Sequence, residues 1–416
     1  MNKIAGFFLI GLLSVMTISC QSQKKESEEE EEENKYELGS FGYDLDFFKT
    51  YQKSLILKKG TSMVLLAPGY QGRVMTSSAK GMSGKSFGWI NYDLISSGES
   101  APHFNNYGGE ERLWLGPDGG QFSVFFAPGV SYTFENWQVP APIDSEAFEL
   151  KEHNDTMAVF QRDFQLVNYS SFTFSIHVDR IVSILGAPEL ESLLDIALPE
   201  EIDFVGYQSV NTITNTGEIA WSKNTGLVSI WMLGQLISSP TNTVIVPYNE
   251  GEEQILGPVV NDNYFGKVPS ERLTFKDGLI FFKADGKQRG KIGLSPLRSK
   301  NYCGSYDSAE KVLTVLFFNK PNHHEGYVNS MWELQEAPFG GDVINSYNDG
   351  PLEDGSQLGP FYELEASSPA ALLKPGQSLS HTNSTIHFSG DDTELNTLLD
   401  ALFGVSVEEV KQALGE

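Results

Sequence analysis

The chain has 416 residues and a formal net charge of −26 at pH 7, with 29 Lys and Arg against 55 Asp and Glu. A body this acidic repels nucleic acid, so nucleic-acid binding is excluded as its main function. The chain has two cysteines, Cys20 and Cys303, and therefore no disulfide framework.

Residues 1–19 have the pattern of a secretory signal peptide. Lys3 gives a short basic start, and the apolar run from Ile4 to Met16 is too short to cross a membrane. The residues before Cys20 resemble the lipobox of a bacterial lipoprotein, although Thr17 stands where Leu is usual. The resemblance implies cleavage before Cys20 and lipid attachment to that cysteine. The alternative is an ordinary signal peptide with a chance cysteine.

Residues 20–37 form an acidic segment with the uninterrupted glutamate run Glu28–Glu33. It has no apolar periodicity, so we expect a disordered tether between the lipid and the folded part. An acidic run after a lipidated cysteine resembles the export signal of some Gram-negative surface lipoproteins, in which the acids lie closer to the cysteine. We expect an outer-membrane lipoprotein on the periplasmic or cell-surface face, with the lipid as its only membrane contact.

From residue 38 onward the periodicity is mostly that of β-strands. Segments rich in Val, Ile, Thr, Phe and Tyr are bounded by Gly, Pro, Asn and Asp, and 40 glycines and 19 prolines fit a chain with many turns. No linker or internal repeat divides the body, so we predict one domain over residues 38–416. The clearest strand patterns lie at 61–68, 121–128, 156–167, 171–185, 203–214, 242–248, 277–284, 311–319 and 378–389.

Helical patterns are sparse. One covers residues 187–198, and residues 391–415 read as two short amphipathic helices separated at Gly404. Capping-box spacing occurs at Asp391–Glu394 and at Ser406–Glu409. The sequence therefore predicts an all-β antiparallel body with short peripheral and C-terminal helices.

Two motifs suggest cofactors and fail on their spacing. The stretch AKGMSGKS ends like a phosphate-binding loop, but Ala79 occupies the place of its first glycine. His323 and His324 are adjacent, which is not the i, i+4 spacing of a helical zinc site. We expect neither a cofactor nor a metal.

Three stretches together resemble galactose mutarotase-like proteins: Gly108–Phe126 (GGEERLWLGPDGGQFSVFF), Tyr207–Trp221 and Phe361–Thr382. Members share a Gly-Gly turn before an Arg and aromatic strand, then an Asn-rich strand, then a Glu strand followed by Leu-x-Pro-Gly. The body from about Gly60 to Ala413 most resembles an uncharacterised family of bacterial lipoproteins in that superfamily. The resemblance implies a large antiparallel supersandwich whose concave face binds a sugar.

Glu111, Arg112 and Trp114 offer the groups that a sugar site needs. Sugars present hydroxyls that pair with charged groups and ring faces that stack on aromatic side chains. Arg112 and Trp114 share a face if they lie on one strand. The structural alternative places Trp114 in the core and pairs Arg112 with Glu111 or Asp118.

Three further candidates are His103, His177 and Lys291. His103 precedes the Gly-Gly turn, and His177 shares a strand face with Asp179. Their structural alternatives are a solvated loop histidine and a satisfied core His–Asp pair. Lys291 belongs to a basic cluster that could recognise a uronate or sulfated sugar, or form a solvated turn: Lys283, Lys287, Arg289 and Lys291.

Mutarotases use a Glu as base on the anomeric hydroxyl and a His as acid on the ring oxygen. The resemblance places the base at Glu365, with Glu363 as the alternative, and His103 is a third catalytic candidate. Residues 217–236, where the family's histidine lies, contain none.

Three functions therefore stay open. The first is an enzyme acting at an anomeric centre or glycosidic bond through Glu365 and Glu363, with Arg112 as a clamp. The second is a non-catalytic glycan-binding lipoprotein, and the third is an envelope protein that docks a partner. We expect a monomer with a carbohydrate ligand.

Overall fold

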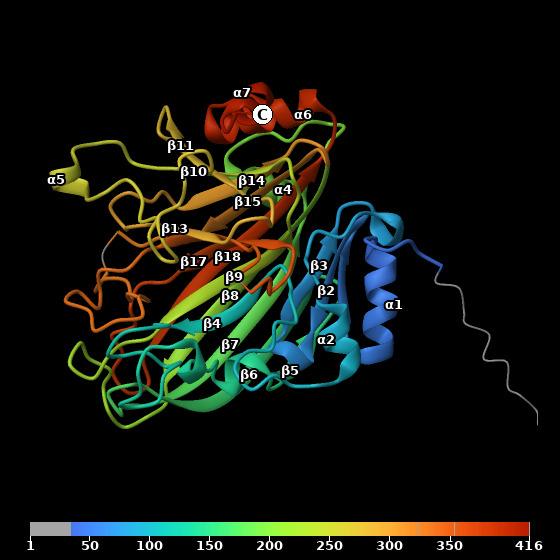
Figure 1. Ribbon diagram of the computed structural model, residues 1–416. Helices are drawn as coiled ribbons and strands as arrows, with labels where there is room; N and C mark the ends of the chain where they lie inside the picture. Colours follow the sequence, from blue (N-terminus) through green and yellow to red (C-terminus); the bar gives the residue numbers. More distant parts are fainter. Residues whose placement is uncertain (1–34, 323, 353, 416) are drawn as a thin grey trace, which may run out of the picture. The chain divides into compact units, whose positions relative to one another are not determined.

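The computed structural model describes residues 35–322, 324–352 and 354–415 (Figure 1). The expected signal peptide, Cys20 and nearly all of the acidic segment lie outside the described residues. No helix within the described ranges is long and apolar enough to cross a membrane.

The larger of two main sheets has ten strands within the described residues, and all its neighbouring pairs are antiparallel. In spatial order they are β11 (Leu273–Lys276), β12 (Leu279–Lys283), β10 (Asn242–Pro247), β14 (Tyr302–Asp307), β15 (Val312–Phe318), β18 (Ser378–Ser389), β8 (Asp203–Asn215), β7 (Thr173–Leu185), β6 (Met157–Val167) and β5 (Glu149–His153).

A second antiparallel sheet, of five strands in the described part of the chain, packs against the first. Its order is β13 (Gly290–Leu294), β16 (Ile344–Asn348), β17 (Phe361–Ser367), β9 (Ser229–Ile237) and β4 (Arg112–Gly116).

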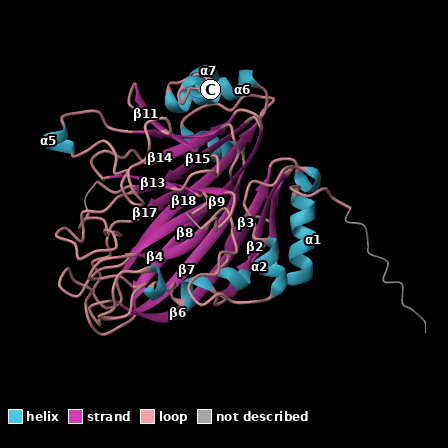
Figure 2. Cartoon of the chain, in the orientation of Figure 1, coloured by secondary structure: helices cyan, strands magenta, loops and turns pink. Residues whose placement is uncertain are grey.

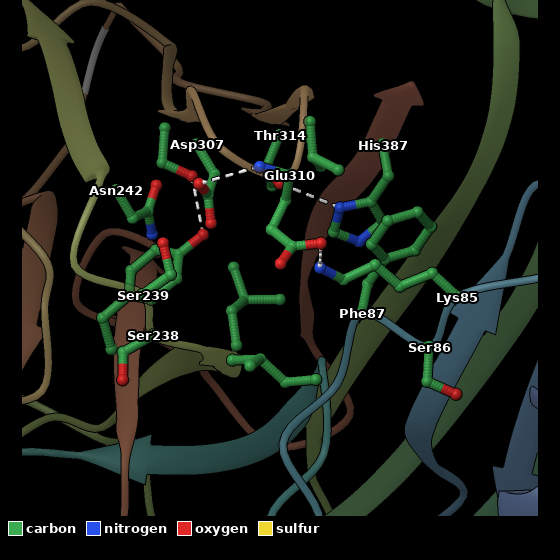
Figure 3. Close-up of a pocket in the computed structure, with 15 residues that line it drawn as sticks. Lys85, Ser86, Phe87, Ser238, Ser239, Asn242, Asp307, Glu310, Thr314 and His387 are labelled. Atoms are coloured by element: carbon green, nitrogen blue, oxygen red, sulfur yellow. Dashed lines mark hydrogen bonds and ion pairs between the residues drawn. The ribbon is translucent and has the colours of Figure 1, made fainter. Parts of the chain in front are cut away.

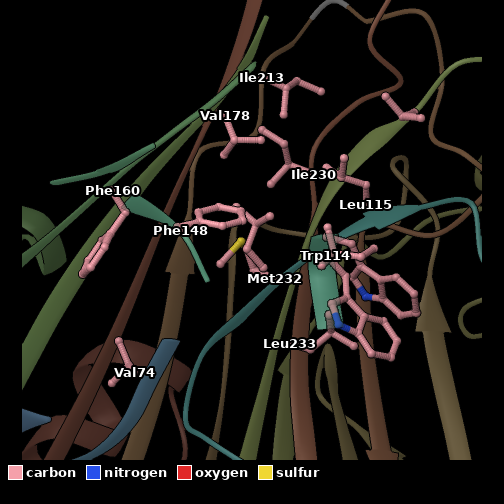
Figure 4. Packing of buried hydrophobic residues seen from close by; sticks show 14 of the residues in the cluster. Val74, Trp114, Leu115, Phe148, Phe160, Val178, Ile213, Ile230, Met232 and Leu233 are labelled. Atoms are coloured by element: carbon pink, nitrogen blue, oxygen red, sulfur yellow. The ribbon is translucent and has the colours of Figure 1, made fainter. Parts of the chain in front are cut away.

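The two sheets enclose the main core, as alternation along the strands requires. Val178 of β7 and Ile213 of β8 pack with Ile230 and Met232 of β9, all at most 1 % exposed (Figure 4). The all-β antiparallel prediction is therefore confirmed, and strands dominate the whole described body (Figure 2).

A small third sheet carries the N-terminal part of the described chain (Figure 1). Ser40 caps the helix that covers it, and Phe41, Leu45 and Phe48 of that helix are buried against the sheet at i, i+4, i+7 spacing. The elements are α1 (Phe41–Tyr51), β1 (Leu55–Lys59), β2 (Ser62–Ala67), β3 (Arg73–Ser78) and α2 (Tyr92–Ser97).

The predicted C-terminal helices are present and cover the ten-stranded sheet from outside. Leu395 and Leu398 pack on strands β15 and β18, and Gly404 ends the first helix in the left-handed conformation. The capping box forms at Ser406–Glu409, whereas Asp391 makes no side-chain cap. These two C-terminal helices are α6 (Asp392–Phe403) and α7 (Val407–Gln412). The other helical elements are α3 (Ala141–Asp144), α4 (Ala187–Leu194), α5 (Glu253–Leu256) and the 3-10 turns Pro68–Tyr70, Gly81–Ser83 and Phe134–Asn136.

Two local predictions are wrong. Residues 121–128 form a loop that pairs only through the single bridge Phe126–Trp137, and Phe125 and Phe126 are buried against other aromatic rings. The solvated turn considered for the basic cluster does not include Lys291, which lies on strand β13 opposite Tyr347 of β16.

Candidate functional site

One face of the five-stranded sheet gathers most of the predicted site residues. Leu364 and Ala366 of β17 point into the core between the sheets, so Glu363 and Glu365 point to the opposite face. Long loops pack over that face. We call it the loop-covered face and define it by Arg112, Trp114, Trp231, Lys291, Glu363 and Glu365.

Arg112 and Glu363 form a buried ion pair on this face. The Nη2 atom of Arg112 donates to Oε1 of Glu363 at 2.5 Å, and the two side chains are 4 % and 8 % exposed. The guanidinium lies 4.5 Å from the Trp114 ring centroid and 5.2 Å from that of Phe104. Its Nε and Nη1 atoms are buried without a hydrogen-bond partner. Arg112 thus keeps two donors available beside an indole.

Glu365 is held by a second cation and a second indole. The Lys291 ammonium lies 2.9 Å from both carboxylate oxygens, and Trp231 Nε1 donates to Oε2 at 2.9 Å. Lys291 also lies 5.1 Å from the Trp231 ring centroid. Glu365 is fully buried, so this ammonium is what offsets its loss of solvation.

The covering loops bring two more carboxyls to the face. Asp118 accepts from Trp137 Nε1 at 2.5 Å and from Trp332 Nε1 at 2.9 Å. Asp342 accepts from the Tyr264 hydroxyl at 2.6 Å. Burial raises the pKa of both carboxyls. These bonds fasten the covering loops to one another.

Glu363 is the carboxyl whose protonation is most suited to chemistry near neutral pH. Burial raises its pKa from 4.5 to about 7; Arg112 opposes that rise and Glu365 adds to it. Burial also lowers the pKa of Arg112, against the pull of Glu363. A carboxyl with a pKa near the working pH can both give and take a proton.

The loop-covered face has little free space. A cavity of about 20 Å³ lies between Trp231, Lys291, Tyr264 and Asp342. That is room for about one water molecule. A sugar therefore requires the covering loops to move aside.

Three predicted site residues lie elsewhere. Glu111 points between the sheets, where it accepts from Arg180 Nη2 at 2.8 Å and Asn383 Nδ2 at 2.7 Å. Since adjacent strand residues face opposite ways, Glu111 cannot share a ligand with Arg112.

Arg112 pairs with Glu363, and not with Glu111 or Asp118 as its structural alternative proposed.

The two histidine candidates are also separate from the glutamates. His103 lies on the loop before β4, and its Nδ1 is 2.8 Å from the carbonyl oxygen of Trp137. His177 lies on β7 of the ten-stranded sheet, 2.9 Å from Asp163 and 3.4 Å from Asp179. Its side chain is 25 % exposed, so the expected core His–Asp pair is a half-exposed surface cluster.

The sequence interpretation missed Trp231, Tyr264 and Asp342. Trp231 alternates with Leu233 and Gln235 on its strand, which was a usable signal. Tyr264 and Asp342 lie on loops, and no local sequence pattern predicts that these loops pack over the sheet. Within the described residues, no group of three His, Cys, Asp or Glu side chains could hold a metal ion.

Solved structures resemble this chain at low sequence identity. The Slr1438 protein from Synechocystis sp. PCC 6803 is 11 % identical with a TM-score of 0.50, over 82 % of this chain and 96 % of that one. A putative aldose 1-epimerase from Escherichia coli K12 is 11 % identical with a TM-score of 0.47, over 80 % and 98 %. A galactose mutarotase-like protein from Lactobacillus casei is 10 % identical with a TM-score of 0.44, over 80 % and 100 %.

The first of these structures shows a shared fold and carries no functional argument. No curated protein matches the sequence of this chain. A family model matches residues 39–414, nearly the whole described body. The chain belongs to the family of unknown function DUF6786.

Proposed function

We propose that the protein binds a carbohydrate on the loop-covered face. The observation that carries the proposal is the Arg112 guanidinium, which is buried over Trp114 with two donor atoms unpaired. A buried donor without a partner costs free energy that a ligand hydroxyl recovers. The neighbouring indoles of Trp114 and Trp231 suit the apolar face of a sugar ring. The resemblance of three sequence stretches to galactose mutarotase-like proteins supports the same ligand class.

The variant Arg112→Lys tests this proposal. Lysine keeps a cation beside Glu363 but lacks the planar set of donors that a sugar would use. Calorimetric titration with a panel of monosaccharides and glycans should show binding by the natural protein and at least about tenfold weaker binding by the variant. His177→Ala, on the other sheet, is the matched control and should bind normally. Absence of saccharide binding by the natural protein, or equal binding by Arg112→Lys, contradicts the proposal.

A second candidate function is acid–base catalysis at the anomeric centre of the bound sugar. The pKa of about 7 at Glu363 favours it. Glu365 is bound by Lys291 and Trp231, so Glu363 is the better proton-transfer group and Glu365 an orienting charge. This assignment reverses the roles expected from the sequence resemblance.

Turnover measurements separate the two functions. Polarimetry on bound sugars and release of aryl leaving groups from glycosides would detect anomeric or glycosidic chemistry. We expect an activity midpoint near pH 7 and loss of activity in Glu363→Gln with binding retained. Binding without turnover over pH 5 to 9 leaves carbohydrate binding as the function.

Lipid anchoring through Cys20 and an outer-membrane location also belong to the proposal. They rest on the sequence of residues 1–37. Cell fractionation of the natural protein and Cys20→Ala tests them: the natural protein should be recovered with outer membranes and the variant in the soluble fraction. Recovery of both in the soluble fraction rules out the anchor.

A further inference from the structure

A second cavity lies between the two sheets, on the other side of strand β17 from the loop-covered face. It measures about 90 Å³, several times the minimum of about 10–15 Å³ that one water needs. Strand β17 separates the two places, because Tyr362 lines the cavity while Glu363 points to the opposite face. Figure 3 shows the lining side chains around this space.

The inner end of the cavity is polar and has spare acceptors. Asn242 is 2 % exposed, and its Oδ1 atom is buried without a hydrogen-bond partner. His387 Nε2 lies 3.1 Å from the Glu110 carboxyl group, and its Nδ1 lies 2.9 Å from the Thr314 hydroxyl, whose oxygen has two lone pairs. The Thr314 oxygen can therefore accept a further bond. These acceptors call for a ligand that donates.

The two opposite charges at the cavity, Lys85 and Glu310, are paired with each other, and the lining also contains the carboxyl group of Asp307. The ion pair lies across the lining, and Asp307 accepts from the Thr241 hydroxyl at 2.7 Å. An anion taken inside would lose its hydration and would lie near the Asp307 carboxyl group without a free positive partner. The rings and methyl groups of Phe87 and Val312 complete the wall. A neutral molecule that carries several hydroxyls fits this combination.

We propose that this cavity is a second binding site, for a short neutral polyol of about the size of glycerol. Its hydroxyls donate to Asn242 Oδ1 and to the Thr314 oxygen. They also meet the Ser305 and Tyr362 hydroxyls, which are 2.6 Å apart and share one hydrogen bond. The site is independent of any saccharide on the loop-covered face.

Two probes with the same carbon skeleton test the recognition of hydroxyls. Glycerol and 1-propanol are titrated into the full protein, and binding is followed by saturation-transfer NMR. The cavity should bind glycerol more tightly, because 1-propanol satisfies only one of the acceptors. Tighter binding of 1-propanol would mean a merely apolar cavity and would overturn the proposal, as would no binding of glycerol.

Two variants locate the binding. Asn242→Leu removes the unpaired acceptor at nearly constant shape and should weaken glycerol binding about tenfold. Ile237 is 38 % exposed and lines the cavity, so Ile237→Trp narrows the cavity and should weaken glycerol binding similarly. If Asn242→Leu does not fold, glycerol binding by Ile237→Trp alone tests whether the cavity is the binding site. His177→Ala is the control and should bind glycerol like the natural protein. Equal glycerol binding by all folded variants would place the bound glycerol on the surface and would overturn the proposed site.

Discussion

At the residue scale, the two glutamates of β17 differ in how their charge is compensated. Glu365 has an ammonium against both oxygens, whereas Glu363 has one contact from a guanidinium that is itself hard to keep charged in the interior. Alternate positions on a strand share a face but not an environment. The pair therefore offers one carboxyl group held at both oxygens by an ammonium and one whose pKa lies near neutrality.

Replacing Lys291 should destabilise the protein strongly. Lys291→Met leaves Glu365 buried without its counter-charge, and losing one partner of a buried pair costs about 3–5 kcal/mol. Urea unfolding measures the loss. The double variant Lys291→Met/Glu365→Gln should recover much of it. Lys49→Met, which breaks an exposed pair with Asp46, should change little; equal effects of the two Lys→Met changes would contradict the prediction.

Glu363 should make folding stability depend on pH near neutrality. Its pKa is about 7 in the folded protein against 4.5 ordinarily, so the folded state holds the proton more tightly. The contribution of Glu363 to the free energy of unfolding is complete below pH 4.5 and is lost as the pH rises through 7. The loss is on the order of 3 kcal/mol.

The variant Glu363→Gln isolates this effect. Glutamine resembles the protonated acid, so the variant should match the natural protein near pH 5 and gain stability relative to it at pH 8. Chemical unfolding at both pH values gives the difference. A difference that does not change with pH contradicts the assigned pKa.

At the element scale, the loops over the site are fastened by few bonds. Tyr264 donates to Asp342 at 2.6 Å, and Asn345 Nδ2 donates to the Tyr264 hydroxyl at 3.2 Å. Nearby, Phe265 lies 3.8 Å from the Arg289 guanidinium but is 47 % exposed. A loop held this way opens at lower cost than the strands beneath it.

Tyr264→Phe should loosen this cover. The ring stays while both hydrogen bonds are lost, so amide hydrogen exchange over residues 257–269 should speed up several-fold without faster exchange in β17. Saccharide association should also accelerate. Unchanged exchange in the loop would show that other contacts hold it closed.

Elements with a strong period were predictable from the sequence, and those set by distant packing were not. The 13-residue strands β7 and β8 and helices α6 and α7 follow their patterns closely. Helix α1 was missed because its aromatic residues suit a strand, although Ser40 and the spacing of Phe41, Leu45 and Phe48 are helix signals. The strand prediction for residues 121–128 was wrong for a similar reason, because residues typical of a strand are buried there in a loop.

At the scale of the whole molecule, the sandwich was predictable but the pairing of strands was not. Arg112 and Glu363 are 251 residues apart and meet because β9 lies between β4 and β17. No local pattern gives that order. Two of the three stretches that carry the resemblance contain β4 and β17 and the third overlaps β8 of the other sheet, while the cation facing each glutamate depended on the register.

The whole molecule should be most stable on the mildly acidic side of neutrality. Asp44 has its pKa raised to about 6 and Glu363 to about 7, so stability falls as the pH rises through that range. The pKa of Asp285 is lowered, which removes stability only as the pH falls well below its ordinary value of 3.8. The growing net negative charge acts in the same direction as the raised groups.

Thermal unfolding between pH 4 and 9 checks this expectation. The melting temperature should be highest near pH 4.5, below which the stabilisation by Glu363 is complete, and should decline toward pH 8. A maximum at pH 8 or above would mean that the buried carboxyls are ionised in the folded protein at little cost.

Strand β17 is also a constraint on how this chain can change over evolution. Its even-numbered residues line the space between the sheets, and its odd-numbered glutamates line the loop-covered face. A one-residue insertion or deletion before Glu363 would exchange the two sets, placing carboxylates in the core and Leu364 at the site. Substitutions can tune either side of this strand separately, but a change of length within it damages both at once.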